Sequence, residues 1–261
     1  MSVTVTEPIV VTNKSGVCVL TISRVEKKNA LTDAMYGTLV EALIAAEKDP
    51  GTHVILFRSE GPMFTSGNDL KDFAAAAMSG VGDGPRNVER FLEALATATR
   101  PIIAAVQGKA IGIGTTMLLH CDYVLLAEDA ELNTPFINLA LVPEAGSTLL
   151  MPARIGYSRA FEMFALGESV KAKDAVAWGI ANRVVPNAQL DETAEQVAQR
   201  FAELPLGAII ATKKMMRDVQ AINKQLEIEK NAFVERLQSP EALEAFTAFM
   251  EKRKPDFSKC S

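Results

Sequence analysis

The chain has 261 residues, of which 48% are hydrophobic and 23% are charged, a composition that supports a sizeable buried core. Its net charge of −5 gives no global positive field that would favour nucleic acid, so a polyanionic ligand would need a local basic patch. We expect no signal peptide and no membrane segment, because no apolar run approaches the roughly 20 residues of a membrane span. The three cysteines show no disulfide-framework spacing, which favours reduced thiols and a cytoplasmic location.

Two histidines are present, and neither has the surroundings of a metal ligand. His53 opens an apolar strand pattern, and His120 lies beside Cys121 in an apolar helical pattern. Adjacent residues on a helix point in different directions, so His120 and Cys121 are poorly placed to share a metal ion. We therefore predict packing or surface roles for both histidines and no metal site.

The first half of the chain alternates strand and helix patterns. Runs of β-branched residues predict strands at 3–11 and 17–23, and buried strands are expected at 54–58, 102–106 and 122–127. Thr32 can cap a helix that continues to Lys48, with Met35, Leu39 and Leu43 on one face. A glycine-interrupted stretch at 108–114 is followed by an apolar helix that ends near residue 121. This alternation predicts an α/β fold with largely buried strands.

From residue 189 onward the pattern is almost entirely helical. Helices are expected at 190–204, 206–219, 223–238 and 240–252. We therefore divide the chain into an α/β core at 1–188 and a C-terminal helical region at 189–261. Lys213, Lys214 and Arg217 are interpreted as one solvated helix face.

Three stretches have the composition of functional loops. Residues 64–71 (FTSGNDLK) lie between a strand and a helix, and taken alone this stretch is better interpreted as an ordinary turn. Residues 108–116 (GKAIGIGTT) place glycines before a helix, which leaves backbone N–H donors open, but their spacing is not that of a dinucleotide or Walker motif. Residues 141–148 (LVPEAGST) carry Glu144 in a loop flanked by apolar sequence, although most such glutamates are solvated.

Taken together and in order, these stretches resemble the crotonase (enoyl-CoA hydratase/isomerase) superfamily, from about residue 3 to about residue 257. The resemblance also rests on further short segments: Asn29-Ala30-Leu31, residues 101–108 (PIIAAVQG), Cys121-Asp122, Trp178-Gly179-Ile180 and residues 249–253 (FMEKR). It implies a spiral of ββα units followed by helices used for trimer assembly, and hence a homotrimer or a dimer of trimers.

The resemblance also implies an acyl-CoA thioester substrate whose carbonyl is held by the backbone N–H groups of Asn68 and Ile113. Such donors stabilise the enolate that forms when a base removes the neighbouring proton. By family position, coenzyme A would contact Lys27, Lys28 and the backbone around Ala30, Asp69 and Leu70, with Phe249 and Lys252 reaching it from a neighbouring subunit. The lysines could equally be solvated surface charges. No cofactor is expected beyond the coenzyme A that the substrate carries.

The sequence departs from the hydratases of this superfamily at both of their glutamates. Thr116 and Phe136 stand at those positions. Neither side chain can exchange a proton at the working pH, so ordinary hydration is disfavoured. The chain instead resembles the peroxisomal-type Δ3,Δ2-enoyl-CoA isomerases, whose catalytic glutamate falls at Glu144. One carboxylate suffices to move a proton from the α-carbon to the γ-carbon.

The substrate pocket is expected to be formed by apolar side chains together with Thr116, and its burial should raise the pKa of Glu144. The apolar members of this predicted wall are Phe136, Leu139, Leu141 and Leu149. Three alternatives stay open from the sequence: a structural role for Glu144, another crotonase reaction that includes hydration by unusual groups, and a non-catalytic acyl-CoA-binding module.

Overall fold

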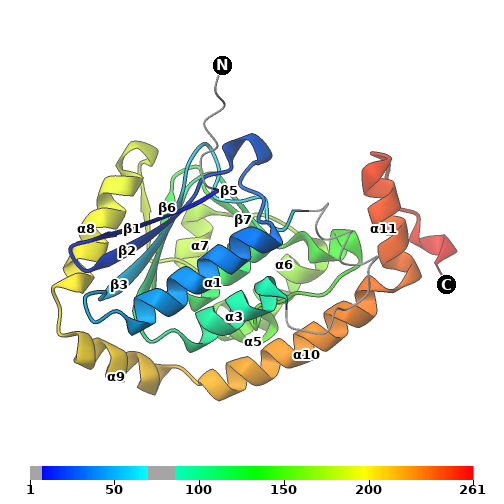
Figure 1. The fold of residues 1–261 in the computed structure, drawn as a ribbon. Helices are drawn as coiled ribbons and strands as arrows, with labels where there is room; N and C mark the ends of the chain where they lie inside the picture. The colour runs from blue at the N-terminus through cyan, green and yellow to red at the C-terminus, as the bar shows by residue number, and fades with distance from the viewer. Residues whose placement is uncertain (1–7, 70–85, 261) are drawn as a thin grey trace.

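The computed structural model describes residues 8–69 and 86–260 (Figure 1). The strands are β1 (Ile9–Lys14), β2 (Val17–Ile22), β3 (Val54–Ser59), β4 (Ile102–Val106), β5 (Lys109–Ile111), β6 (Tyr123–Ala127), β7 (Glu131–Asn133), β8 (Val170–Lys171) and β9 (Arg183–Val185). The α-helices are α1 (Asp33–Lys48), α3 (Asn87–Thr97), α4 (Ile113–Thr116), α5 (Ser147–Ile155), α6 (Tyr157–Leu166), α7 (Ala172–Trp178), α8 (Leu190–Ala202), α9 (Leu206–Met216), α10 (Val219–Leu237) and α11 (Pro240–Met250). Short 3-10 helices are η1 (Val25–Lys27), η2 (Met117–His120), η3 (Pro135–Leu139), η4 (Asn187–Gln189) and η5 (Phe257–Lys259).

Six strands form the main sheet, in the order β1-β2-β3-β4-β6-β9. β1 runs antiparallel to β2, and the remaining neighbours are parallel. A smaller sheet has the order β5-β7-β8. The predicted α/β class is confirmed, and parallel strands explain why the predicted core strands consist of nearly unbroken apolar residues.

Alternation along each strand sends successive side chains to opposite faces of the main sheet. On β3, Ile55 and Phe57 join the large core beneath α1 and α3. Val54 and Leu56 point to the other face, where they pack with alanines of α8. The helical region after residue 189 therefore begins with α8, which packs on one face of the sheet against β2, β3, β4 and β6.

The last two helices extend away from that layer. α10 runs along the base of the molecule in contact with α3 and α5, and α11 stands beside η3 at the far end (Figure 1). Ala242 and Phe246 of α11 belong to one apolar cluster with Phe136, Leu141 and Phe233. The C-terminal helix thus covers the segment around η3 of its own chain.

Most predicted elements are present, and the differences have local causes. Thr32 caps α1 by accepting a 3.3 Å hydrogen bond from the Met35 N–H. The single helix expected before Cys121 is instead α4 followed by the tighter η2, where Cys121 N donates to Leu118 O at 3.1 Å. The short strand β5 within residues 108–114 was not predicted, because three residues are too few to show a period. Residues 3–7 of the first predicted strand lie outside the described residues.

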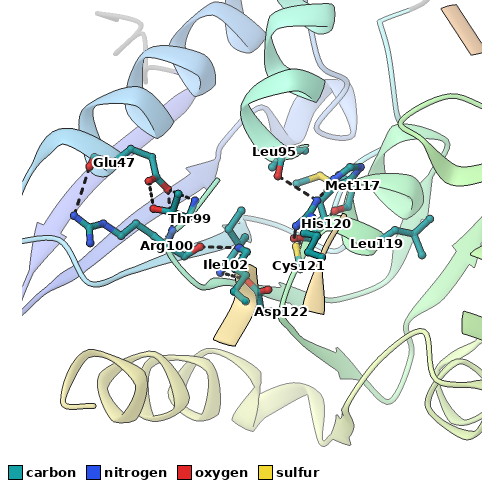
Figure 2. A network of polar contacts seen from close by, with 12 residues as sticks. Glu47, Leu95, Thr99, Arg100, Ile102, Met117, Leu119, His120, Cys121 and Asp122 are labelled. Atoms are coloured by element: carbon teal, nitrogen blue, oxygen red, sulfur yellow. Dashed lines mark hydrogen bonds and ion pairs between the residues drawn. The ribbon is translucent and has the colours of Figure 1, made fainter. Parts of the chain in front are cut away.

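The interpretation of Lys213 and Arg217 as a solvated face is wrong. The Lys213 ammonium donates to the Asp122 carboxylate at 2.7 Å and to Arg100 O at 2.8 Å, and its side chain is only 9% exposed. Arg217 donates to His120 O at 3.1 Å. The surroundings of Arg100, His120 and Asp122 are shown in Figure 2. Both cations satisfy backbone carbonyls of the core, which helical periodicity cannot indicate. No helix in the described part of the chain is long and apolar enough to cross a membrane.

Candidate active site

Two loops that are far apart in the sequence are joined by strand-like hydrogen bonds. Thr65 N donates to Lys109 O at 3.2 Å, and Ile111 N donates to Thr65 O at 3.0 Å. Glycines permit this close approach: a Cβ on Gly67 would lie 2.9 Å from Ile111 O, and one on Gly114 would lie 2.4 Å from Thr65 Cγ2. The pairing therefore brings the segment before residue 69 beside the start of α4.

The N–H groups of Asn68 and Ile113 lie in these two loops. Leu31 pairs with the groups on either side of Asn68, because Leu31 N donates to Gly67 O at 2.9 Å and Asp69 N donates to Leu31 O at 2.8 Å. Ile113 is the first residue of α4, where an N–H has no intrahelical acceptor. No described residue accepts a hydrogen bond from either N–H. The arrangement suits two backbone donors that act on one ligand oxygen.

Tyr36 fixes the side chain of Asn68. Its hydroxyl donates to Asn68 Oδ1 at 2.5 Å, and the ring is buried. Burial, together with the nearby charges of Glu144 and Asp33, raises the pKa of Tyr36 well above its usual value. The phenol therefore stays a hydrogen-bond donor. Sequence reasoning missed Tyr36, which reads as one more buried residue of α1.

Glu144 faces a small cavity of about 110 Å³. Thr116 is fully buried and donates from its hydroxyl to Glu144 Oε1 at 2.7 Å. Burial raises the pKa of Glu144 to about 8; the hydrogen bond from Thr116 opposes this rise, and the charge of Glu229 adds to it. The predicted direction of the pKa is confirmed, and the carboxyl can both take and return a proton near neutral pH.

The apolar wall around Glu144 differs from the predicted one. The described lining of the small cavity includes Leu31, Val88, Leu92, Leu226 and Phe233. The predicted wall residues Phe136, Leu139 and Leu141 line a different, larger cavity. Leu149 lies on α5, is 38% exposed and lines neither cavity. The prediction failed because it took sequence neighbours of Glu144, whereas the cavity is closed by α3 and α10.

The larger cavity has a volume of about 1300 Å³ and collects the positions expected to contact coenzyme A. The predicted residues among its lining are Lys27, Lys28, Ala30, Asp69, Ile113 and Phe249. Phe249 comes from α11 of the same chain. It therefore lines this cavity within a single chain, whereas the resemblance implied that it would come from a neighbouring subunit. Lys252 is exposed and does not line the cavity, and Leu70 lies outside the described residues.

Further cations line this cavity that sequence reasoning did not single out. They are Arg24, Lys109 and Arg253. Arg24 donates to the Asp69 carboxylate at 2.7 Å and to Ala30 O at 2.9 Å. The signal that could have revealed Arg24 is its place in the short segment 24–28, which also contains Lys27 and Lys28 and lies at the wall of the cavity. These cations add positive charge to the cavity beside Lys27 and Lys28, and each of them is also paired with a carboxylate of the protein.

The loop that carries Glu144 is held from inside the protein by His120. The His120 ring lies 2.7 Å from Ala145 O through Nε2 and 2.5 Å from an Arg217 guanidinium nitrogen through Nδ1. Arg217 can only donate, so the imidazole accepts at Nδ1 and donates from Nε2. Burial and the neighbouring Arg217 charge lower the pKa of His120 to about 3, which keeps the ring neutral. Among residues 8–69 and 86–260 no group of three or more His, Cys, Asp and Glu side chains is arranged to hold a metal ion.

Comparison with known proteins agrees with this geometry. The family model of enoyl-CoA hydratase/isomerase matches residues 12–260. The 1,2-epoxyphenylacetyl-CoA isomerase of Escherichia coli is 32% identical over 94% of this chain and 96% of its own length. Enoyl-CoA delta isomerase 2 of Rattus norvegicus is 30% identical over 94% of this chain and 64% of its own length. Other curated relatives bear the names of hydratases.

A solved structure, the enoyl-CoA hydratase/isomerase of Pseudoalteromonas atlantica, superposes with a TM-score of 0.91 at 35% identity. The match covers 96% of this chain and all of that one (100%). The fold, the two paired loops and the matched family model lead to one assignment. The chain belongs to the enoyl-CoA hydratase/isomerase family of the crotonase superfamily, whose members act on acyl-CoA thioesters.

Proposed function

We propose that this chain is a Δ3,Δ2-enoyl-CoA isomerase, which shifts the double bond of a 3-enoyl-CoA into conjugation with the thioester. The observation that carries the proposal is the position of Glu144 at the wall of an apolar cavity that Asn68 also lines. One titratable carboxyl with a pKa of about 8 thus lies in the cavity beside the loop of the proposed carbonyl-binding N–H groups.

The two cavities support a division of the substrate. Asn68, Asp69 and Phe233 line both cavities, so the two spaces meet at the loop that carries the Asn68 N–H. The nucleotide end of an acyl-CoA fits the larger cavity with its cations, and the acyl chain fits the smaller apolar one. The thioester then lies at the junction, where the N–H groups of Asn68 and Ile113 would bind its carbonyl oxygen.

The reaction follows from these groups. The Glu144 carboxylate removes a proton from C2, and the electron pair of that C–H bond moves into a dienolate whose negative charge gathers on the thioester oxygen. The two backbone donors stabilise this oxyanion. The protonated Glu144 then returns the proton to C4, which leaves a double bond between C2 and C3. The proton count balances, and water takes no part.

Hydration is less well supported by the site. Thr116 occupies one of the positions where the hydratases of the family carry a glutamate, and its hydroxyl is committed to Glu144. Phe136 occupies the other and is packed with Leu141 and Phe233. Glu229, the other buried glutamate at the small cavity, already accepts hydrogen bonds from Gly146 and Thr148. Glu144 therefore lacks the partner that would activate water.

The test is to incubate the protein separately with a short 3-enoyl-CoA and the matching 2-enoyl-CoA. We expect the first to gain the ultraviolet absorbance of a conjugated thioester and the second to form no 3-hydroxyacyl-CoA, as followed by chromatography. Water addition to the second would identify a hydratase. Tight binding of both esters with no conversion would identify a binding module, and either result would overturn the isomerase proposal.

A further inference from the structure

The loop that carries Glu144 has an unusual backbone. Ala145 and Gly146 both have φ of 67°, in the left-handed region. Glycine adopts this conformation freely, but alanine does so only at a cost. A conformation of this kind persists when contacts from the surrounding structure hold it in place. The direction in which the Glu144 side chain points therefore depends on what holds residues 145–148.

One of these contacts comes from α10. Glu229 Oε2 accepts a hydrogen bond from Gly146 N at 2.6 Å, and Oε1 accepts from Thr148 N at 2.8 Å and from Thr148 Oγ1 at 2.5 Å. The carboxylate thus occupies the N-terminus of α5, where N–H groups lack intrahelical partners and negative charge is favourable. Glu229 is 4% exposed, so solvent cannot substitute for these contacts.

Glu229 also faces the same space as Glu144. Both glutamates line the small cavity, and Glu229 is the one whose carboxylate oxygens are both engaged by the 146–148 backbone. The loop is consequently fixed from two sides: His120 binds Ala145 O, and Glu229 binds the next N–H groups along the chain. Glu229 thus both caps the N-terminus of α5 and lines the cavity that Glu144 faces.

We propose that Glu229 is a positioning residue for Glu144, because it holds the 145–148 loop so that the Glu144 carboxylate faces the substrate cavity. This inference rests on the proposed isomerase function. It makes α10 part of the active site as well as part of the C-terminal helical region.

The experiment compares Glu229→Gln with Glu227→Gln, a matched change at an exposed position of the same helix. A glutamine at 229 keeps the size of the side chain, but its amide NH₂ confronts one of the loop N–H donors. We expect kcat for the 3-enoyl-CoA to fall at least about tenfold, the usual range for a mispositioned acid/base, with KM within about twofold of wild type. Glu227→Gln should match wild type in both.

The pH profile separates positioning from simple stabilisation. The charge of Glu229 raises the pKa of Glu144, and Glu144 must be ionised to take the proton. Removing that charge lowers the pKa of Glu144, so the rising limb of kcat against pH should move to lower pH in Glu229→Gln. Amide hydrogen exchange at residues 146–148 should also become faster than in wild type.

A lowered melting temperature with an unchanged kcat per folded molecule and an unmoved pH limb would overturn the proposal and leave Glu229 a helix cap. If Glu229→Gln does not fold, Thr148→Val removes the hydroxyl contact with Glu229, together with the hydrogen bond that Gln225 donates to the same hydroxyl. It should lower kcat modestly and leave the pH limb in place, and an unchanged kcat would count against the proposal. Failure of the proposed function is separately visible, because wild type would then not isomerise 3-enoyl-CoA or Glu144→Gln would retain activity. Amide hydrogen exchange at residues 146–148 tests whether Glu229 holds the loop, whether or not the protein isomerises 3-enoyl-CoA.

Discussion

The hydroxyl of Thr116 donates a 2.7 Å hydrogen bond to Oε1 of Glu144, although the two residues are 28 positions apart in the chain. The family resemblance assigns a hydratase glutamate to the position of Thr116, and in this chain the side chain at that position instead hydrogen-bonds to Glu144. This contact stabilises the ionised form of Glu144 against the effect of burial.

Thr116→Val should therefore move the rising limb of kcat against pH to higher pH. The hydrogen bond lowers the pKa of Glu144, its loss raises that pKa, and the carboxylate that serves as base forms only at higher pH. Thr116→Ser keeps a hydroxyl and should retain the wild-type limb. Isomerase rates measured between pH 6 and 10 would show the shift, and identical profiles for both variants would contradict the role of this contact.

Glu144→Gln should lower isomerase turnover by about 10²–10⁴, the usual contribution of a positioned acid/base. Binding of the CoA ester should change little, because the larger cavity that would hold the nucleotide end is untouched. Single-turnover assays and calorimetry with an unreactive acyl-CoA separate the two effects. Activity above a tenth of wild type would exclude Glu144 as the base.

Gly114→Ala tests the close approach of the two loops. The added Cβ would lie 2.4 Å from Thr65 Cγ2, so either α4 or the loop that carries Thr65 must shift. We expect a loss of about 1–3 kcal/mol of unfolding free energy, as for overpacking of a core, and a lower kcat because the Ile113 N–H moves away from Asn68.

Gly207→Ala on α9 is the matched control, because its Cβ would meet nothing within 4 Å. Replacing a helical glycine in open space should leave kcat unchanged and stabilise the fold by about 0.5–1 kcal/mol. Urea unfolding and steady-state kinetics on both variants provide the comparison. Equal kcat for the two variants would mean that the position of α4 does not matter to the reaction.

His120 should make the protein sensitive to acid. The pKa of His120 falls from an ordinary value of 6.5 to about 3 in the folded protein. Below pH 6.5 the histidine is therefore protonated in the unfolded chain while it stays neutral in the folded one. The stability that depends on the neutral His120 ring is fully present above pH 6.5. It is lost as the pH falls toward 3, by about 1.4 kcal/mol of unfolding free energy per pH unit.

Urea titrations at pH 7 and pH 5 check this contribution. In His120→Gln the loss of stability between the two values should be smaller than in wild type, since glutamine does not titrate. The difference between the two proteins isolates His120 from Glu144 and Glu229, whose raised pKa values act with the opposite sign. Equal losses in both proteins would contradict the buried neutral imidazole.

A chain that ends at Gln238 should lose affinity for CoA esters. It lacks Phe249 and Arg253 from the wall of the larger cavity, and it uncovers Phe136 and Leu141. We also propose, from family position, that it loses the trimeric state that the resemblance assigns to residues 189–261.

Light scattering, calorimetry and circular dichroism on that truncation, beside a chain that ends at Asp256 and keeps α11, would test both statements. The longer chain should behave as the full protein does. A folded truncation that binds acyl-CoA normally would remove α11 from the site, and one that remains trimeric would place assembly elsewhere.

Local patterns in the sequence were enough to determine much of this protein. The alternation of strand and helix patterns and the Thr32 cap indicated the α/β fold, and the order of the loop motifs indicated the crotonase family. Through the family resemblance, the same motifs pointed to Asn68, which lines both cavities, to Glu144, which lines the smaller one, and to Ile113, which lines the larger one. Such features are readable because each depends on residues close together in the chain.

Only the tertiary structure decided which groups surround Glu144. Tyr36, Arg217 and Glu229 carry no motif, and the predicted wall residue Leu149 lies outside both cavities. The period of a helix tells which of its faces is buried, but it does not tell what that face meets. α10 is distant from Glu144 in the chain, yet Glu229 binds the loop that follows Glu144, because helix packing brings together residues that no local pattern connects.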